Sequence, residues 1–264
     1  MRNSTINLLQ KSIQKRYNKS LIFNMSGHSK WATIKRQKSL NDQKRGKTFT
    51  KLANAITIAV KQGGGIGDPN SNFRLRLAID AARTSNMPKE NIERAIKRAT
   101  ESKTGSFEEV IYEGFAPGGV SVIIEAATDN SLRTTSEVKS IFHKAGASFG
   151  QPGSVSYQFK HIGRIIVKKK NMSFDEIFTI AADNGADDLE EVLDEVFIYT
   201  PMQNLAKIKE ALSFQGLEIV EADLIRAPIV TVEVGDEEKL NKIENFVSSL
   251  EEMDDVQKVY TNLS

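Results

Sequence analysis

A dense cluster of cationic side chains lies near the N-terminus. Residues 26–52 read SGHSKWATIKRQKSLNDQKRGKTFTKL and contain one acidic residue, Asp42, and the only tryptophan, Trp31. The cations are Lys30, Lys35, Arg36, Lys38, Lys44, Arg45, Lys47 and Lys51. Dispersed cations neutralise phosphates and release counterions, which drives binding to nucleic acid. We therefore interpret this stretch as a nucleic-acid-binding segment, with a solvated helix face as the alternative.

Further cations follow at helical spacing. Arg74 and Arg76 are included in the candidate interface, and Arg83, Arg94, Lys97 and Arg98 extend the positive region. Trp31 fits two roles, a base-stacking platform worth roughly 1–3 kcal/mol or a hydrophobic anchor. No zinc finger or RNA-recognition signature is present, so phosphate or shape recognition is favoured over base reading.

Enzymatic and metal chemistry has little support in the sequence. There is no cysteine, and His28, His143 and His161 are isolated. Residues 63–67 are glycine-rich, but they follow a helical pattern and lack the Gly-Lys-Ser/Thr ending of a phosphate loop. The carboxylates within 187–195 lack calcium-loop spacing and read as a solvated face. We expect no catalytic residue, metal, cofactor or small-molecule substrate.

The net charge of +2 conceals a strong asymmetry. Residues 1–104 hold 22 Lys and Arg against 6 Asp and Glu, a net of +16, whereas residues 105–264 hold 14 against 28, a net of −14. Such an imbalance attracts polyanions to one end of a molecule. The composition thus predicts a basic binding arm on an acidic body.

The first 24 residues have the composition of a targeting sequence. They contain no acidic residue, five cations, and an apolar stripe at Ile6, Leu9, Ile13 and Tyr17. An amphipathic, basic, acid-free leader is typical of a mitochondrial transit peptide. We expect a protein of the mitochondrial matrix, with an extension that has no targeting role as the alternative. No apolar run approaches the roughly 18 residues of a membrane-spanning helix, so membrane insertion is not expected.

Hydrophobic periodicity divides the rest of the chain. Apolar stripes within 49–60, 75–82 and 92–99 predict three helices in a small bundle. From residue 110 the pattern changes to period two, with strands expected at 110–115, 120–127, 154–159, 164–167, 195–200, 217–225, 230–234 and 256–261. Helices are expected at 131–145, 174–184, 202–215 and 237–250.

These elements predict an α+β fold. We expect an N-terminal three-helix domain followed by two ferredoxin-like α+β domains, the second inserted in the first. The domains are expected at 25–104, at 105–160 plus 228–264, and at 161–227.

Several motifs resemble one family. SGHSKWATIK, KRGKTFTKLANAITIAVKQGGG, NMPKENIERAIKRA, YEGFAPGGVSVIIEAATDN and GSVSYQF closely resemble the YebC/PmpR family. With a transit peptide, the chain resembles the mitochondrial branch and its translational activator of cytochrome c oxidase. The sequence departs from the family in two places. Ser131 and Leu132 stand where a basic residue and an asparagine usually follow Thr128-Asp129-Asn130, and Lys35-Arg36-Gln37-Lys38 differs from the usual residues although its charge is retained.

The resemblance implies three domains and a role in translation. We expect a translation activator that binds mitochondrial mRNA or rRNA and the mitoribosome, and that promotes synthesis of proteins such as a cytochrome c oxidase subunit. The alternative is a DNA-binding transcriptional regulator.

Overall fold

The N-terminal domain of the computed structural model is a bundle of three helices. The structure describes residues 45–101, 107–170 and 172–264, with side chains described from residue 48. Helices α3 (Arg45–Gln62), α4 (Phe73–Thr84) and α5 (Lys89–Glu101) pack through the predicted stripes. Ile56, Val60 and Leu75 are fully buried at the centre of this core. The helical prediction is confirmed for the described residues.

A glycine turn and one asparagine connect α3 to α4. Gly64 and Gly65 adopt φ of 71° and 82°, a left-handed conformation that glycine enters without steric cost. Asn72 caps α4 by accepting from the Leu75 N–H, and its Nδ2 donates to the Ala59 carbonyl at 2.9 Å. The glycine-rich stretch is therefore a helix stop, as its position after α3 predicted.

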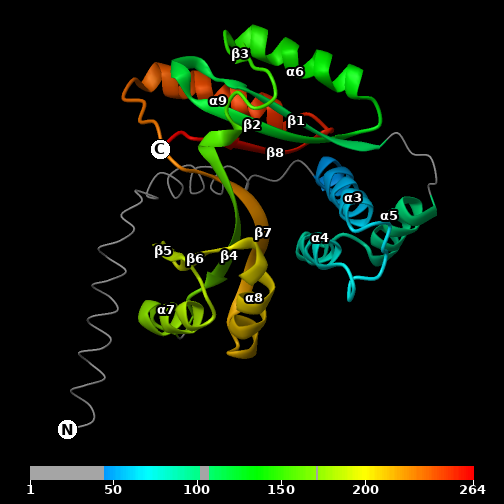
Figure 1. Cartoon of the computed structure of the whole chain (residues 1–264), viewed down its shortest axis with the longest axis vertical. Helices are drawn as coiled ribbons and strands as arrows, with labels where there is room; N and C mark the ends of the chain where they lie inside the picture. Colours follow the sequence, from blue (N-terminus) through cyan, green and yellow to red (C-terminus); the bar gives the residue numbers. More distant parts are fainter. Residues whose placement is uncertain (1–44, 102–106, 171) are drawn as a thin grey trace.

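The second domain is a four-stranded antiparallel sheet covered by two helices. Its elements are β1 (Glu108–Phe115), β2 (Ser121–Thr128), α6 (Ser131–Ala145), the short β3 (Ser148–Phe149), α9 (Glu237–Glu251) and β8 (Val256–Thr261). The strand order is β3-β1-β2-β8. Helices α6 and α9 lie side by side on one face of this sheet (Figure 1), where Phe142, Phe246 and Val122 form the core.

The third domain has ferredoxin-like topology. Its elements are β4 (Phe159–Lys168), α7 (Phe174–Asp183), β5 (Asp188–Val192), β6 (Glu195–Thr200), α8 (Leu205–Phe214) and β7 (Glu218–Pro228). The order β5-β6-β4-β7, antiparallel throughout, is that of a βαββαβ fold. All of it lies between β3 and β8 of the second domain, so the predicted insertion is confirmed. The exact domain limits stay a prediction.

The second domain differs from the simple ferredoxin-like connection. The unit β2–α6–β3 corresponds in position to β4–α7–β5 of the third domain, and β1 takes the position of β6. However, β1 comes before β2 in the chain, whereas β6 follows β5. The β1–β2 hairpin turns through η1 (Pro117–Gly119), where Gly118 and Gly119 have φ of 83° and 79°. The sheet layout is therefore shared, whereas the chain path is not.

Three expected elements are different in the structure. Residues 154–159 form a loop with the 3₁₀ turn η2 (Ser156–Gln158), and β4 begins only at Phe159. Residues 230–234 make one isolated bridge, Val232 to Leu263. The acidic stretch expected to be a solvated face contains β5, an edge strand paired with β6. Charged side chains suit an edge strand, because they discourage pairing with other chains.

Candidate nucleic-acid interface

Most of the predicted interface residues lie outside the described structure. This applies to Lys30, Trp31, Lys35, Arg36, Lys38 and Lys44, and to the side chains of Arg45 and Lys47 at the start of α3. Lys51, Arg74 and Arg76 are the predicted residues whose side chains can be placed. Their contacts decide which of them can reach a phosphate.

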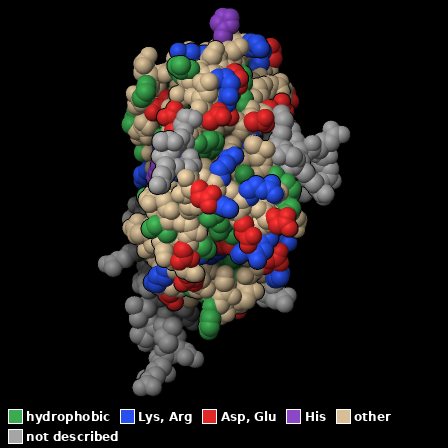
Figure 2. Space-filling view, turned by 90° about the vertical axis from the view of Figure 1, so that its right-hand side faces the viewer, with side chains coloured by type: hydrophobic (Ala, Val, Ile, Leu, Met, Phe, Trp, Pro, Cys, Tyr) green, Lys and Arg blue, Asp and Glu red, His purple; other side chains and the backbone are tan. Residues whose placement is uncertain are grey.

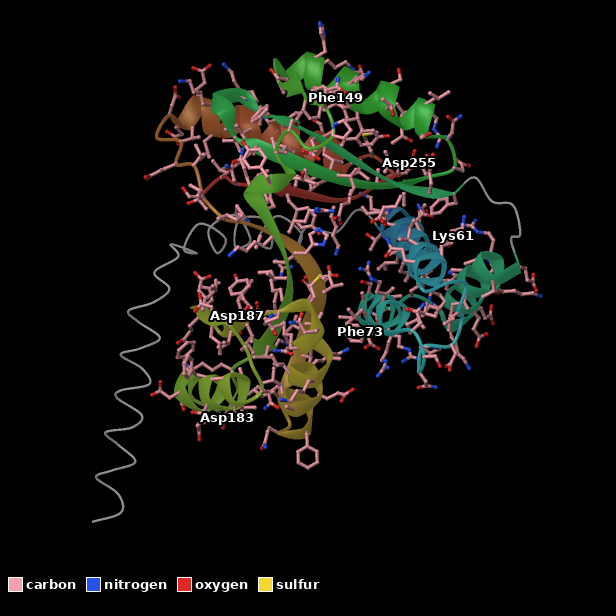
Figure 3. All side chains as sticks on the ribbon, viewed as in Figure 1. Lys61, Phe73, Phe149, Asp183, Asp187 and Asp255 are labelled. Carbon is pink, nitrogen blue, oxygen red and sulfur yellow. The ribbon has the colours of Figure 1, made fainter. Side chains whose placement is uncertain are left out.

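Lys51 contacts the second domain. It is half-buried, and its Nζ donates to the Glu251 carbonyl at 2.5 Å, at the C-terminus of α9. Carbonyl groups at a helix C-terminus carry partial negative charge and favour a cation there. Lys61, at the other end of α3, donates in the same way to the Phe107 carbonyl at 2.7 Å (Figure 3). These two lysines attach the helical domain to the second domain.

Arg76 stabilises the turn before α4. Its Nε and Nη2 donate to the carbonyls of Pro69 and Asn70 at 3.1 and 3.3 Å, and Nη1 lies 3.7 Å from Glu210. Arg74 is exposed and donates to the side-chain oxygen of Gln62. Arg74 is therefore available to an anion, whereas Arg76 is held in a structural role.

Exposed cations that the candidate set did not include lie on α5. Arg94, Lys97 and Arg98 are all exposed. Lys97 pairs with Glu101 at 3.8 Å, and Arg94 and Arg98 have no ion pair with a described residue. Figure 2, which views the side of the molecule where α5 lies in Figure 1, shows Lys and Arg interspersed with Asp and Glu rather than gathered in one patch. The described part of the helical domain thus contributes scattered cations.

The three domains meet around a cleft of about 960 Å³. It is lined by parts of α3, α4, β2, β7 and the end of α9. Three of its cations face carboxylates: Lys209 lies 2.5 Å from Asp80, Arg226 lies 2.6 Å from Glu125, and Lys258 pairs with Asp223. Arg74 also lines the cleft, at the α3–α4 side. Because the other three charges are already matched, most of the cleft is a poor site for a phosphate backbone.

Burial at this junction shifts two titratable groups. Burial and the nearby Arg226 lower the pKa of His161. Burial and the nearby Glu125 raise the pKa of Glu109. The salt bridge from Arg226 to Glu125 therefore joins β7 to β2 in a partly desolvated environment, which makes it a contact that fixes the third domain on the second.

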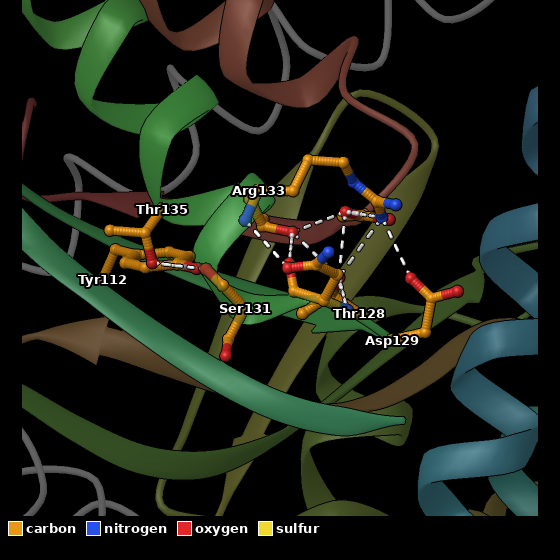
Figure 4. Close-up of polar contacts among 9 residues, drawn as sticks. Tyr112, Thr128, Asp129, Ser131, Arg133 and Thr135 are labelled. Carbon is orange, nitrogen blue, oxygen red and sulfur yellow. Dashed lines mark hydrogen bonds and ion pairs between the residues drawn. The ribbon is translucent and has the colours of Figure 1, made fainter. Parts of the chain in front are cut away.

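The Thr128-Asp129-Asn130 motif has a structural role. The Asn130 side chain caps α6 by accepting from the Arg133 N–H, and Arg133 bridges Asp129 at 3.1 Å and Asp255 at 3.0 Å (Figure 4). Burial alone would raise the pKa of Asp255, but hydrogen bonds from Thr134, Arg133 and Thr128 outweigh it and lower the pKa. The motif thus ties the start of α6 to β8.

Other site classes find no support within the described residues. They contain no group of three or more His, Asp or Glu that could hold a metal ion. Within the same ranges, no helix has the length and apolarity needed to cross a bilayer. His143 is exposed on α6 and His161 lies on β4, so the two histidines belong to different domains.

The fold defines a three-domain α+β protein with a cationic helical end and an acidic body. The chain belongs to the TACO1/YebC family. The family's N-terminal domain matches residues 29–102, and its second and third domain matches residues 107–263. Together these matches cover most of the chain.

Close relatives are bacterial proteins. A probable transcriptional regulatory protein of Syntrophomonas wolfei is 46% identical over 243 residues, covering 91% of this chain and 96% of the relative. One of the same name in Persephonella marina is 48% identical over 240 residues, covering 90% and 95%. The crystal structure of the conserved hypothetical protein Aq1575 from Aquifex aeolicus has a TM-score of 0.78 and 45% identity, covering 84% of this chain and 91% of that one.

These relatives correct part of the sequence interpretation. The predicted mitochondrial location is wrong, because the close relatives come from bacteria. The transit peptide expected at residues 1–24 lies outside the described residues and gains no support from bacterial relatives. The family assignment is confirmed, but the mitochondrial branch is not. The names of the relatives favour transcriptional regulation over mitochondrial translation.

Proposed function

We propose that the protein is a DNA-binding regulator of transcription without a catalytic step of its own. The cationic segment 26–52 carries this proposal, with Arg74 and the exposed cations of α5 as additional phosphate contacts. Relatives at 46% and 48% identity that are named probable transcriptional regulatory proteins support it. The matched charges of the domain junction support a binding surface at the N-terminal end instead.

Contacts of this kind would be made mainly to phosphates. Flexible lysines and arginines without a base-reading scaffold fix a protein on the DNA backbone but carry little sequence information. Affinity should therefore fall steeply with salt, with a log–log slope of about −0.9 for each phosphate neutralised on duplex DNA. Sequence preference would then come from DNA shape and deformability.

The test measures binding of the full chain to fluorescently labelled duplex DNA over a range of salt concentrations. The test variant replaces Lys44, Arg45 and Lys47 with Glu. The control variant replaces Lys144, Lys207 and Lys242 with Glu. These lysines are exposed on α6, α8 and α9, so the control makes the same change in net charge. We expect the test variant to lose about three units of salt slope, and the control to change little. Equal losses in both variants would refute the proposed surface.

A structured RNA of equal length serves as competitor. If this RNA displaces the labelled DNA at a lower concentration than unlabelled DNA of the same length does, the proposed role in transcription is wrong and an RNA-directed role is favoured. An affinity for DNA that is independent of salt would exclude phosphate recognition altogether.

A further inference from the structure

Helix α4 has a second face, which packs on the third domain. Its first face, with Leu75 and Ile79, belongs to the core of the helical domain. The second face carries Phe73 and Leu77, one turn apart, and both pack in the hydrophobic core of the third domain. Figure 3 shows Phe73 on the side of α4 that faces β7 and α8. Leu77 is buried there, so one helix contributes to the cores of two domains.

Two ion pairs flank this apolar contact. Lys209 of α8 lies 2.5 Å from Asp80, and Glu210 of α8 lies 3.7 Å from Arg76. Arg76 and Asp80 come three and seven residues after Phe73, so they lie on the same face of α4 as the apolar pair. We call this contact between α4 and the third domain the clasp; it comprises Phe73, Arg76, Leu77, Asp80, Lys209 and Glu210.

The clasp can separate without detaching the helical domain from the second domain. It consists of one apolar pair and two ion pairs, and polar contacts of this kind between domains normally allow relative motion. Lys51 and Lys61 of α3 hold the helical domain on the second domain by donating to main-chain carbonyls. Lysine side chains are long and flexible, so these bonds tolerate a rotation of α3. The clasp is therefore the contact that such a rotation would break.

Opening the clasp would change what two cations can reach. Arg74 and Arg83 line the cleft at the domain junction, and β7 of the third domain forms part of its wall. A cleft of about 960 Å³ has the size of a small-ligand pocket and does not admit a DNA duplex. Residues 161–227 of the third domain hold 7 Lys and Arg against 13 Asp and Glu, a net charge of −6. This field opposes the approach of phosphates to the closed cleft.

We propose that the clasp is an autoinhibitory contact, which keeps Arg74 and Arg83 from nucleic acid until it opens. This regulation rests on the proposed function. Nucleic acid binds the open form better, because only there do both arginines reach the duplex. The apparent dissociation constant scales inversely with the binding-competent fraction. If about nine in ten molecules are closed, releasing the clasp tightens binding about tenfold.

Reversing one charge of the clasp tests the proposal, with the full chain and labelled duplex DNA at low salt. Lys209→Glu places a carboxylate against Asp80. The control Lys207→Glu makes the same change in net charge at an exposed position on the same helix. Added negative charge normally weakens DNA binding. We nevertheless expect Lys209→Glu to bind about tenfold tighter than wild type, and Lys207→Glu to bind no tighter. Equal or weaker binding by Lys209→Glu would overturn the proposal.

Two further variants identify the origin of the gain. Asp80→Lys/Lys209→Glu restores an ion pair of reversed polarity and the net charge of wild type, so its affinity should return to that of wild type. In an Arg74→Gln/Arg83→Gln background, Lys209→Glu should no longer tighten binding. A gain that persists in the first variant would exclude the ion pair as its cause, and one that persists in the second would exclude the two arginines. Either result refutes the proposal.

The opening itself is measured by the distance between two spin labels. The chain has no cysteine, and Ser85 and Ser213 are exposed on the lining of the cleft, so Ser85→Cys/Ser213→Cys provides the labelling sites. We expect a short distance in the free protein, and a longer one when Lys209→Glu or DNA is added. The same distance in all three states would refute the clasp. A longer distance with Lys209→Glu, but no DNA binding by wild type or any variant, would refute the proposed function while the opening stands.

Discussion

The buried carboxylate of Glu113 offers a sharp test of how the loop before the third domain is held. Glu113 on β1 is 6% exposed. Its Oε1 accepts from the Gly153 N–H at 2.8 Å, and its Oε2 accepts from the N–H groups of Val155 and Ser156 at 2.7 and 2.9 Å. Burial alone would raise the pKa of Glu113, but these backbone donors outweigh it and lower the pKa. One charge thus organises the loop that leads into β4.

The cost of Glu113→Gln follows from these bonds. The amide keeps the shape of the carboxylate, but its one oxygen cannot serve all three donors, and its NH₂ group faces an N–H. A hydrogen bond to a charged group contributes about 1.5–3 kcal/mol, and a buried donor left unpaired adds a desolvation cost. We expect a loss of about 2–4 kcal/mol in the free energy of unfolding. The midpoint of thermal unfolding should fall by roughly 5–15 °C.

Thermal and urea unfolding, followed by circular dichroism, measure this loss near pH 7. Glu108→Gln on the same strand is the control, because Glu108 is exposed. Since the pKa of Glu113 is lowered on folding, its contribution is present above the ordinary value of 4.5 and disappears as the pH falls through the folded value. The difference between wild type and Glu113→Gln should therefore shrink on acidification. A difference below about 0.5 kcal/mol near pH 7, the usual size for a surface substitution, would refute the argument.

Three further predictions concern the domain cores, the domain junction and pH. Asn72→Ala should lower the free energy of unfolding by about 2–4 kcal/mol, because it removes a helix cap and leaves the Ala59 carbonyl without its donor. Urea unfolding measures this loss, and a loss no larger than that of Thr84→Ala would contradict the prediction. Glu125→Leu should lower the free energy of unfolding by about 3–5 kcal/mol, because it leaves Arg226 buried without its partner. The double variant Glu125→Leu/Arg226→Leu should recover part of that loss in the same urea unfolding assay. Additive losses of the two single variants would disprove the coupling. Lys170 and Lys168 lower the pKa of Glu218 to about 2, so the stabilising effect of this carboxylate should be complete above pH 4.5 and vanish toward pH 2. The difference in thermal unfolding midpoint between wild type and Glu218→Gln, measured from pH 7 to pH 2, tests this. A difference that stays constant with pH would rule the prediction out.

Local patterns were sufficient for most helices and strands. The stripes within 49–60, 75–82 and 92–99 match α3, α4 and α5, because each helix buries one face and periodicity records that face directly. The α+β class and the insertion were also predictable, since the last helix and strand lacked partners in the third domain. Family motifs between residues 26 and 159 identified the family.

Other features depended on contacts that the sequence does not encode locally. Strand β5 is rich in Asp and Glu, which rarely favour a strand, and it exists because β6 offers an unpaired edge. Residues 154–159 alternate like a strand, but Glu113 takes their backbone N–H groups and holds them as a loop. Arg76 resembled the other cations in sequence, yet it is held by carbonyls of its own turn.

The sequence by itself determined where charge is concentrated, which faces are apolar, and the family to which the chain belongs. These properties depend on residue type and on neighbours within one or two helical turns, so they are present before the chain folds. The tertiary structure decided which cations remain accessible and which are neutralised, and which strands are paired. Those outcomes depend on groups such as Lys51 and the Glu251 carbonyl, which lie 200 residues apart and meet only after folding.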